Sequence, residues 1–374
     1  MGVVRFEQIA RECRESYKGS LQGKPIVGLE HIEPYDMLLK NYDVDVETTF
    51  TKSFEKGQIL FGRRRAYQHK ACVATIDGIC SGDITVIEPI KGAVDPDLLP
   101  FIIQNDNFFE HAIKGSNGAL SPRVKWEHMA NYEVKLPSID EQRKLAEKLW
   151  AAYEVKQSYL KMIEATQEMV KSQFIEMFGD QNTNERCWED SFIKELFSLS
   201  MGKTPARNRP DYWQQSSNKW ISISDMAKYN RYTGDTDETI SDIAVKETGI
   251  KKVPKGTIIM SFKLSIGRTA ITSEDIYTNE AIMAFQDVDT NKFDISFLYY
   301  LIANKNWLYN AKQAVKGQTL NKESIGNSKI IVPPIALQKQ FANILIQADK
   351  SEFELRKSID AIDKVIKSLI NENL

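Results

Sequence analysis

A segment of about 40 residues occurs twice in this chain, and the duplication constrains its fold more than any other feature. Residues 136–142 recur as residues 332–338, an offset of 332 − 136 = 196, and the match continues without a gap. Both copies open with the pattern Pro-x-Ile-x-x-Gln. A repeat at a fixed offset indicates two copies of one structural unit, so we expect a chain of two similar halves.

Each copy of the repeat is expected to form one long α-helix. A proline stands beside each helix start, where its fixed φ suits the first turn. Ser138 and Glu141 have the spacing of a capping box, and Gly179 can cap the end of the first helix. Apolar or small residues recur at spacings of three and four, as in the seam of a coiled coil. The residues expected at the helix-pair interface are Leu145, Leu149, Ile163, Val170, Phe341, Leu345, Ile359 and Ile366.

The two helices are expected to pair with each other. About 40 helical residues span roughly 60 Å, and neither apolar seam is stable in water alone. The first helix must run from the first domain to the second, and the second helix must return, so the pair is antiparallel and the domains are related by a pseudo-two-fold axis. Lys156 and Glu352 occupy equivalent positions and are expected to form an ion pair in that arrangement.

The sequences between the helices also repeat, at an offset of 255 − 56 = 199. Lys56-Gly57 and Lys255-Gly256 each precede apolar residues, which predicts a turn that enters a buried strand. Asp95 and Asp294 are expected to be N-caps of short helices. The fold class is therefore α+β, with two mixed α/β domains separated by two long antiparallel helices. The expected segments are a first domain at 1–136, a helix at 137–179, a second domain at 180–332 and a helix at 333–374.

Composition and charge exclude several classes of protein. No run approaches the roughly 18 apolar residues of a membrane helix, and the N-terminus lacks the layout of a signal peptide. The net charge of −2 argues against a purely electrostatic DNA binder but allows local basic patches. The cysteines lack zinc spacing, and we expect them to be reduced thiols of a cytoplasmic protein. They are Cys13, Cys72, Cys80 and Cys187.

Further motifs carry a resemblance to a known family. Gly202-Lys203-Thr204-Pro205 is followed by Tyr212-Trp213 and Trp220-Ile221. These motifs lie after the first of the two helix starts and before the second of the two Lys-Gly turns. In the order and duplication of these motifs, the chain resembles the DNA-specificity subunits of type I restriction–modification systems over essentially its whole length. The first domain departs from the pattern, because residues 14–19 stand where the Gly-Lys-Thr-Pro motif is expected.

The resemblance implies a non-catalytic subunit. Each domain would be a target recognition domain that reads one half of a bipartite, asymmetric double-stranded DNA target. The helices would set the length of the unread spacer and dock the methyltransferase subunits, two of which are expected, and restriction/translocase subunits would join the complex. This chain would hold no cofactor and no metal, because S-adenosylmethionine and ATP with Mg would bind to the partner subunits. No membrane contact is expected.

Basic and polar residues at strand ends and in glycine-containing loops are the candidates for DNA contact. Arginine and lysine neutralise phosphates, while arginine, glutamine and asparagine can read bases with two hydrogen bonds. Lys263 and Ser265 are expected on one face, provided that the strand before them continues. Core packing is the preferred interpretation for Tyr212, Trp213 and Trp220. The candidates are Arg63, Arg64, Arg65, Tyr67, Gln68, Lys114, Asn117, Lys203, Thr204, Arg207, Arg209, Lys263, Ser265, Arg268, Lys316 and Gln318.

The sequence contains partial matches to three catalytic patterns, and none of them is an intact motif. A phosphate-binding loop around Lys203 would need glycine in place of Phe197, and Pro205 would break the helix that must follow. Residues 332–335 lack the polar and aromatic residues of an amino-methyltransferase motif. Asp97 and residues 133–135 can be read as the Asp and Glu-x-Lys of a nuclease. Such widely spaced patterns occur by chance in most charged chains, so this match does not indicate a nuclease.

Two other functions remain open from the sequence. A structural adaptor would organise protein partners through its helices, and it would fail to bind any duplex at any salt concentration. A stand-alone regulator would bind its DNA site tightly without a methyltransferase.

Overall fold

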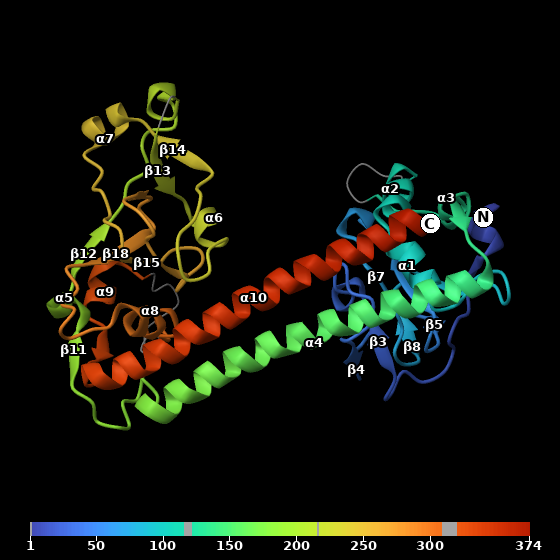
Figure 1. The fold of residues 1–374 in the computed structure, drawn as a ribbon, viewed down its shortest axis with the longest axis horizontal. Coiled ribbons are helices and arrows are strands. Elements are labelled where there is room, and N and C mark those ends of the chain that lie inside the picture. The colour runs from blue at the N-terminus through green and yellow to red at the C-terminus, as the bar shows by residue number, and fades with distance from the viewer. Residues whose placement is uncertain (1, 116–121, 215–216, 309–319) are drawn as a thin grey trace. The chain divides into compact units, whose positions relative to one another are not determined.

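The computed structural model describes residues 2–115, 122–214, 217–308 and 320–374 (Figure 1). By its contacts the chain forms two compact units, unit one (1–161 with 355–374) and unit two (162–354). The two long helices, α4 (Ile139–Phe178) and α10 (Ile335–Asn373), each give one half to each unit. Both helices begin at the isoleucine of the Pro-x-Ile-x-x-Gln pattern, so the long helices predicted from the repeat are confirmed.

The described residues of unit one form one two-stranded and two four-stranded sheets. The pair is β1-β10, and the larger sheets have the orders β2-β9-β6-β7 and β4-β3-β8-β5. All neighbours are antiparallel except β3 and β8, which are parallel. The strands are β1 (Gly2–Arg5), β2 (Ala10–Cys13), β3 (Pro25–Val27), β4 (Asp43–Val44), β5 (Lys52–Phe54), β6 (Ile59–Gly62), β7 (Ala71–Val73), β8 (Gly78–Cys80), β9 (Ile84–Pro89) and β10 (Glu133–Leu136). The helices are η1 (Phe6–Gln8), η2 (Leu29–His31), η3 (Ala66–Gln68), α1 (Leu99–Gln104), α2 (Asp106–Lys114) and α3 (Trp126–Ala130).

Unit two repeats this plan strand for strand, apart from β5. Its sheets have the orders β11-β19, β12-β18-β15-β16 and β14-β13-β17, and β13 and β17 are again parallel. The strands are β11 (Asp190–Phe192), β12 (Ser198–Met201), β13 (Asn218–Ile221), β14 (Glu238–Ile240), β15 (Ile258–Ser261), β16 (Thr269–Ile271), β17 (Tyr277–Thr278), β18 (Ile282–Gln286) and β19 (Lys329–Ile331). The helices are α5 (Ile193–Leu196), η4 (Pro210–Tyr212), α6 (Ile223–Met226), α7 (Asp242–Thr248), α8 (Ile295–Ala303) and α9 (Lys322–Gly326). Because the strand order is duplicated along with the sequence, the predicted mixed α/β domains and their internal repeat are confirmed.

The duplicated Lys-Gly turns enter buried strands, as the sequence predicts. Gly57 and Gly256 have φ values of 91° and 79°, a region that favours glycine. Their backbone N–H groups donate to Ala74 O and Thr272 O, both at 2.8 Å. All four residues of β6 and all four of β15 are buried. Each turn therefore fixes the start of the central strand of a four-stranded sheet.

The predicted aspartate caps differ between the units. Asp294 caps α8, because its carboxylate accepts the N–H groups of Ser296 and Phe297 at 2.9 and 3.1 Å. Asp95 instead opens a turn ahead of α1, with its carboxylate accepting the N–H of Asp97 at 3.0 Å. The N-cap position of α1 is Leu98, so the cap prediction is correct for Asp294 and wrong for Asp95.

The glutamine of each Pro-x-Ile-x-x-Gln pattern is buried and joins the helix to the domain before it. Gln142 donates from Nε2 to Pro137 O at 3.0 Å and accepts the N–H of Asp95 on Oε1 at 2.9 Å. Gln338 makes the same two contacts, to Pro333 O at 2.7 Å and from the N–H of Asp294 at 3.0 Å. We call these paired contacts the glutamine latch.

The long helices are antiparallel within unit one. The N–H of Lys135, just before α4, lies 3.4 Å from the carbonyl of Leu374 at the chain end. Further along α4, Lys156 forms an ion pair of 2.7 Å with Asp363 of α10. Leu145, Leu149 and Ile370 of α10 share one core with residues of α1 and α2. Residue numbers that rise along α4 therefore pair with residue numbers that fall along α10, which is the pattern of antiparallel helices.

Unit two has the same helix direction. Gln167 donates to Glu352 at 3.1 Å, and the rings of Phe174 and Phe341 lie 5.4 Å apart. The pairs Lys156–Asp363 and Gln167–Glu352 are counterparts, since 156 + 196 = 352 and 167 + 196 = 363. The expected Lys156–Glu352 ion pair is wrong, because the helix pairing sets Lys156 against Asp363, which lies eleven residues beyond Glu352 on α10.

Seven of the eight predicted interface residues are buried. Those that belong to the core of unit one or unit two are Leu145, Leu149, Val170, Phe341 and Leu345. Ile163 and Ile359 are also buried, and Ile366 is partly buried against the core of unit one. The apolar seam is thus withdrawn from water, which is the main reason for two helices of this length to form.

The glutamine latch leads to a stability prediction. Gln142→Ala leaves the N–H of Asp95 and the carbonyl of Pro137 buried without their partner, which should cost on the order of 2–4 kcal/mol. Gln347→Ala, at an exposed position of α10, is the control and should stay within about 0.5 kcal/mol of wild type. Urea unfolding of the full chain measures both. Equal midpoints for the two variants would contradict the role of the latch.

Candidate nucleic-acid interface

The candidate residues of unit one lie in the loop between β6 and β7, residues 63–70, which we call the arginine loop. Arg63 is tied by its backbone to two other segments, donating to Asp83 O at 2.9 Å and accepting from Val124 N at 2.8 Å. The N–H of Arg65 donates to Pro122 O at 3.0 Å. Arg65 and Tyr67 are exposed, whereas Arg63, Arg64 and Gln68 are half-buried. The backbone of the loop is therefore fixed while Arg65 and Tyr67 face solvent.

A single carboxylate organises the basic side chains of this edge. Asp83 lies 2.8 Å from Nε of Arg123 and 3.5 Å from Nη1 of Arg64. The hydrogen bond from Arg123 holds the pKa of Asp83 below its usual value, with the charge of Arg64 adding to the effect. Asp83 is thus ionised and orients two guanidinium groups at this edge of the domain.

His69 anchors the other end of the arginine loop. Its ring lies 4.8 Å from that of Tyr35 and 4.4 Å from that of Phe109. Burial lowers the pKa of His69, although the charge of Asp106 opposes the shift. Lys70 donates to Leu29 O at 2.6 Å and is engaged in the fold.

The equivalent loop of unit two is a tight turn. β15 ends at Ser261, and the N–H of Gly267 returns to Ser261 O at 2.9 Å. The strand does not continue, so the expectation that Lys263 and Ser265 share one face of a strand is wrong. The physical reason is Gly267, whose φ of 87° closes the turn. Lys263 and Arg268 are exposed on either side of it.

Glu280 occupies the place in unit two that Asp83 holds in unit one. Both follow the parallel strand, β17 or β8, in the turn that leads to the next strand. Burial opposes the ionisation of Glu280, but a hydrogen bond from Thr204 and the charges of Lys263 and Arg207 lower its pKa. A carboxylate therefore lies among basic loops on the corresponding edge of each domain.

The two arginines after the Gly-Lys-Thr-Pro motif are already paired with acids. Arg207 forms a bidentate ion pair with Glu238, and its Cζ lies 3.9 Å from the ring centroid of Trp213. Arg209 pairs with Asp211 at 2.6 Å and with Glu247 at 3.3 Å. To bind a phosphate, either arginine would have to exchange one of these partners, so they rank below Arg65, Lys263 and Arg268.

The Gly-Lys-Thr-Pro motif has a structural role that its residues explain. A Cβ on Gly202 would lie 1.7 Å from the carbonyl oxygen of Thr278, so only glycine fits against β17. The indole of Trp220 donates to Lys203 O at 3.0 Å, and the ammonium of Lys203 donates to Thr248 O at 2.7 Å. Trp220 is buried, in agreement with core packing.

The remaining candidates are less constrained. Lys114 is exposed at the end of α2, while Asn117, Lys316 and Gln318 lie outside the described residues. Where the chain is described, no group of three or more His, Cys, Asp or Glu side chains could hold a metal ion. None of the helices in the described ranges is long and apolar enough to span a bilayer.

Sequence reasoning missed Asp83, Arg123 and Glu280. The two acids follow short strands that match at an offset near 199, so a full alignment of the two domains could have paired them. Arg123 gave no signal, because 40 residues separate it from the carboxylate that it contacts.

The chain is similar to known DNA-specificity proteins. Residues 185–363 match the model of the family described as type I restriction modification DNA specificity domain. The MjaIX specificity subunit of a type I restriction enzyme from Methanocaldococcus jannaschii is 27% identical over 183 residues, 48% of this chain and 41% of that protein. The EcoprrI specificity subunit from Escherichia coli is 25% identical over 165 residues, 41% of this chain and 40% of that protein. The chain therefore matches about two fifths of the length of these relatives.

Solved structures share the fold. The S subunit of a type I restriction–modification system from M. genitalium has a TM-score of 0.59 at 12% identity, over 99% of this chain and 94% of that one. A chain from a study of the assembly of a type I restriction–modification system has a TM-score of 0.57 at 15% identity, over 100% and 97%. At these identities the likeness shows the fold alone, and it agrees with the fold class predicted from the repeat.

The burial of His69 leads to a pH prediction for the arginine loop. Because the folded pKa is lowered, this histidine contributes stability above its unfolded pKa of about 6.5 and loses it as the pH falls toward the folded pKa. The NMR titration of His69 should give a pKa below 6.5, and His69→Phe should weaken the pH dependence of unfolding between pH 7.5 and 5. A measured pKa above 6.5 would contradict this arrangement.

Proposed function

Residues 185–363 match the family model of type I restriction–modification DNA specificity domains, and from this match we propose that the chain reads the sequence of double-stranded DNA. Each of its two domains contacts one half of a bipartite target. The chain has no chemical step of its own in this proposal, in agreement with the relatives above, which are all named specificity subunits.

The observation that carries the proposal is the duplicated basic edge. In unit one, Arg123 and Arg64 meet at the carboxylate of Asp83. In unit two, the charge of exposed Lys263 helps to lower the pKa of Glu280, and Arg268 is exposed in the same turn as Lys263. Arginine and lysine beside an ionised carboxylate are groups that can bind a DNA groove. The cations neutralise phosphates, and the carboxylate can accept a hydrogen bond from the amino group of cytosine. The same edge of both domains therefore carries groups that position DNA and groups that can read bases.

The two halves of the target differ in this proposal. Unit one exposes Arg65 and Tyr67 on a loop that contains the short helix η3, whereas unit two exposes Lys263 and Arg268 on a loop that Gly267 closes as a turn. Asp83 and Glu280 also differ in side-chain length, so they would reach different base edges. An asymmetric target is the expected consequence of these differences.

Partner subunits complete the activity. We infer that methyltransferase subunits, two of them, dock on the chain and that restriction/translocase subunits join the complex. S-adenosylmethionine would bind in the methyltransferase, and ATP with Mg in the translocase. The exposed faces of α4 and α10 support this arrangement, since they carry apolar side chains such as Val155, Met162 and Phe353 that helical partners could cover.

A salt titration tests the role of the arginine loop. Duplexes are first selected from a random library by the chain bound to its methyltransferase, and binding is then measured from 50 to 200 mM salt. Arg65→Ala should reduce the slope of log K against log salt by about 1, because one phosphate contact is lost. The triple alanine variant of Arg63, Arg64 and Arg65 should reduce it by up to about 3.

Lys91→Ala is the matched control, since Lys91 is exposed beyond the end of β9 that lies opposite Asp83. It should leave the slope unchanged. An unchanged slope in the triple variant would remove the loop from the interface, and the absence of any selected duplex would contradict DNA reading itself.

A further inference from the structure

One loop in each unit is bonded to the same edge strand in the same way. In unit one, Val73 donates its backbone N–H to Met37 O at 2.8 Å; in unit two, Ile271 donates to Arg231 O at 2.7 Å. The carbonyl of each strand residue accepts an N–H two residues further along the loop, at 2.9 and 3.0 Å. Met37 and Arg231 therefore hold equivalent positions in the two domains.

The long helices contact these loops from equivalent positions. Tyr153 of α4 and Asp349 of α10 correspond, since 153 + 196 = 349. The hydroxyl of Tyr153 donates to Asp36 Oδ1 at 2.5 Å, next to Met37 in the loop. Asp349 Oδ2 lies 2.7 Å from Nη1 of Arg231. Each contact lies within one unit, so each domain is joined to the helix that follows it.

The contact in unit two balances a buried charge. The side chain of Arg231 is 7% exposed, and its Nε and Nη2 atoms are buried without a hydrogen-bond partner among the described residues. The ring of Tyr299 lies 5.4 Å from its Cζ. Asp349 is thus the one carboxylate paired with this guanidinium in the described parts of the chain.

In unit one the anion of the contact belongs to the loop, whereas in unit two it belongs to the helix. Asp36 forms an ion pair with Lys40 at 2.5 Å and accepts the hydroxyl of Tyr153. Burial opposes the ionisation of Asp36, but these two hydrogen bonds hold its pKa below the usual value. The loop residue that contacts the helix is therefore an anion and the helix residue a neutral donor, whereas in unit two the loop residue is a cation and the helix residue an anion.

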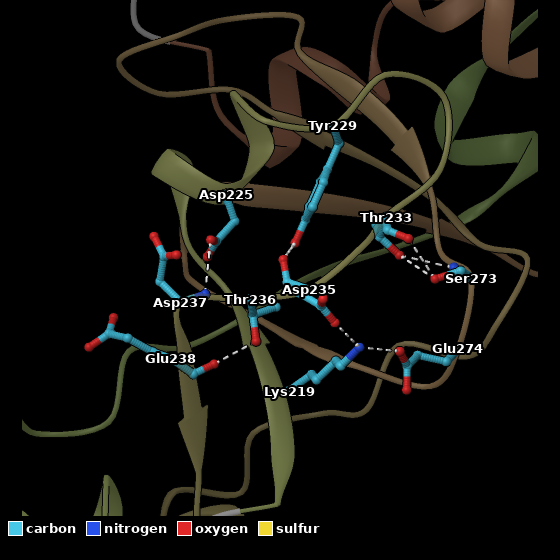
Figure 2. Close-up of polar contacts among 10 residues, drawn as sticks. All are labelled: Lys219, Asp225, Tyr229, Thr233, Asp235, Thr236, Asp237, Glu238, Ser273 and Glu274. Carbon is cyan, nitrogen blue, oxygen red and sulfur yellow. Dashed lines mark hydrogen bonds and ion pairs between the residues drawn. The ribbon is translucent and has the colours of Figure 1, made fainter. Parts of the chain in front are cut away.

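The loop of unit two is firmly joined to the rest of its domain, as Figure 2 shows. Asp225, which is fully buried, accepts the N–H of Asp237 at 3.1 Å on one side of the loop. On the other side, Thr233 and Ser273 form hydrogen bonds through their hydroxyl groups, the shortest at 2.7 Å. The segment that contains Arg231 is therefore bonded on both sides to the rest of unit two.

We propose that Tyr153 and Asp349 are positioning residues, and that their different chemistry matches each domain to its own helix. An exchange of the domains would bring Asp36 to Asp349, two carboxylates, and would leave the buried Arg231 opposite a tyrosine. The inference rests on the proposed function only for its consequence, which is that each domain presents its DNA-reading loops in one orientation.

Urea unfolding of the full chain tests the pairing without DNA. Asp349→Asn leaves a buried guanidinium unpaired and should lower the folding equilibrium constant about a hundredfold. Adding Arg231→Met, which introduces the residue that unit one has at this position, should recover at least about tenfold of that loss. A double variant that loses stability by the sum of the two single losses would overturn the proposal.

DNA discrimination tests the positioning. The probes are a duplex selected by the wild-type complex and two versions of it, each with one half scrambled. Tyr153→Phe, which keeps the ring, should lose about tenfold in discrimination at one half, and Asp349→Asn should lose it at the other. Equal losses at both halves for either variant would overturn the assignment. If wild type selects no split target, the proposed function fails, and the unfolding comparison alone decides on the positioning residues.

Discussion

The buried glutamine at the start of each long helix is the constraint on which both halves depend. One side chain pairs the carbonyl of a proline before the helix with an N–H in the turn at the end of the domain sheets. Gln142 follows Asp95 by 47 residues and Gln338 follows Asp294 by 44, which accounts for the two repeat offsets of 196 and 199. The segment between the aspartate turn of each domain and the start of the long helix can differ in length between the two halves. The glutamine side chain bonds to both ends of this segment and so keeps them together.

The parts of the fold that local pattern determines could be predicted from the sequence. The spacing of apolar residues gives α4 and α10, and the duplicated Lys-Gly turns give the buried strands β6 and β15. Contacts set by packing could not be predicted in this way. Lys156 meets Asp363 because the helices are antiparallel, and Lys263 lies in a turn because Gly267 closes it. The DNA-contacting residues stay a prediction, and the ion pairs of Arg207 and Arg209 show why charge alone ranks them poorly.

The two halves keep one scaffold and change its chemistry at a few positions. The strand order, the Lys-Gly turns and the glutamine latch occur in both units, so the sheets and the starts of the long helices are the same in the two halves. The carboxylate among the basic loops is an aspartate in one unit and a glutamate in the other, and the helix residue that holds the domain is Tyr153 or Asp349. A duplicated framework with different loops gives two readers that need not recognise the same bases.

We propose that the chain contains two different DNA readers and directs modification by partner subunits. Methylome sequencing of cells that express the chain together with its cognate methyltransferase tests this proposal. We expect methylation confined to one split target with two dissimilar halves and a spacer of fixed length. Methylation without sequence preference, or at a single continuous site, would contradict it.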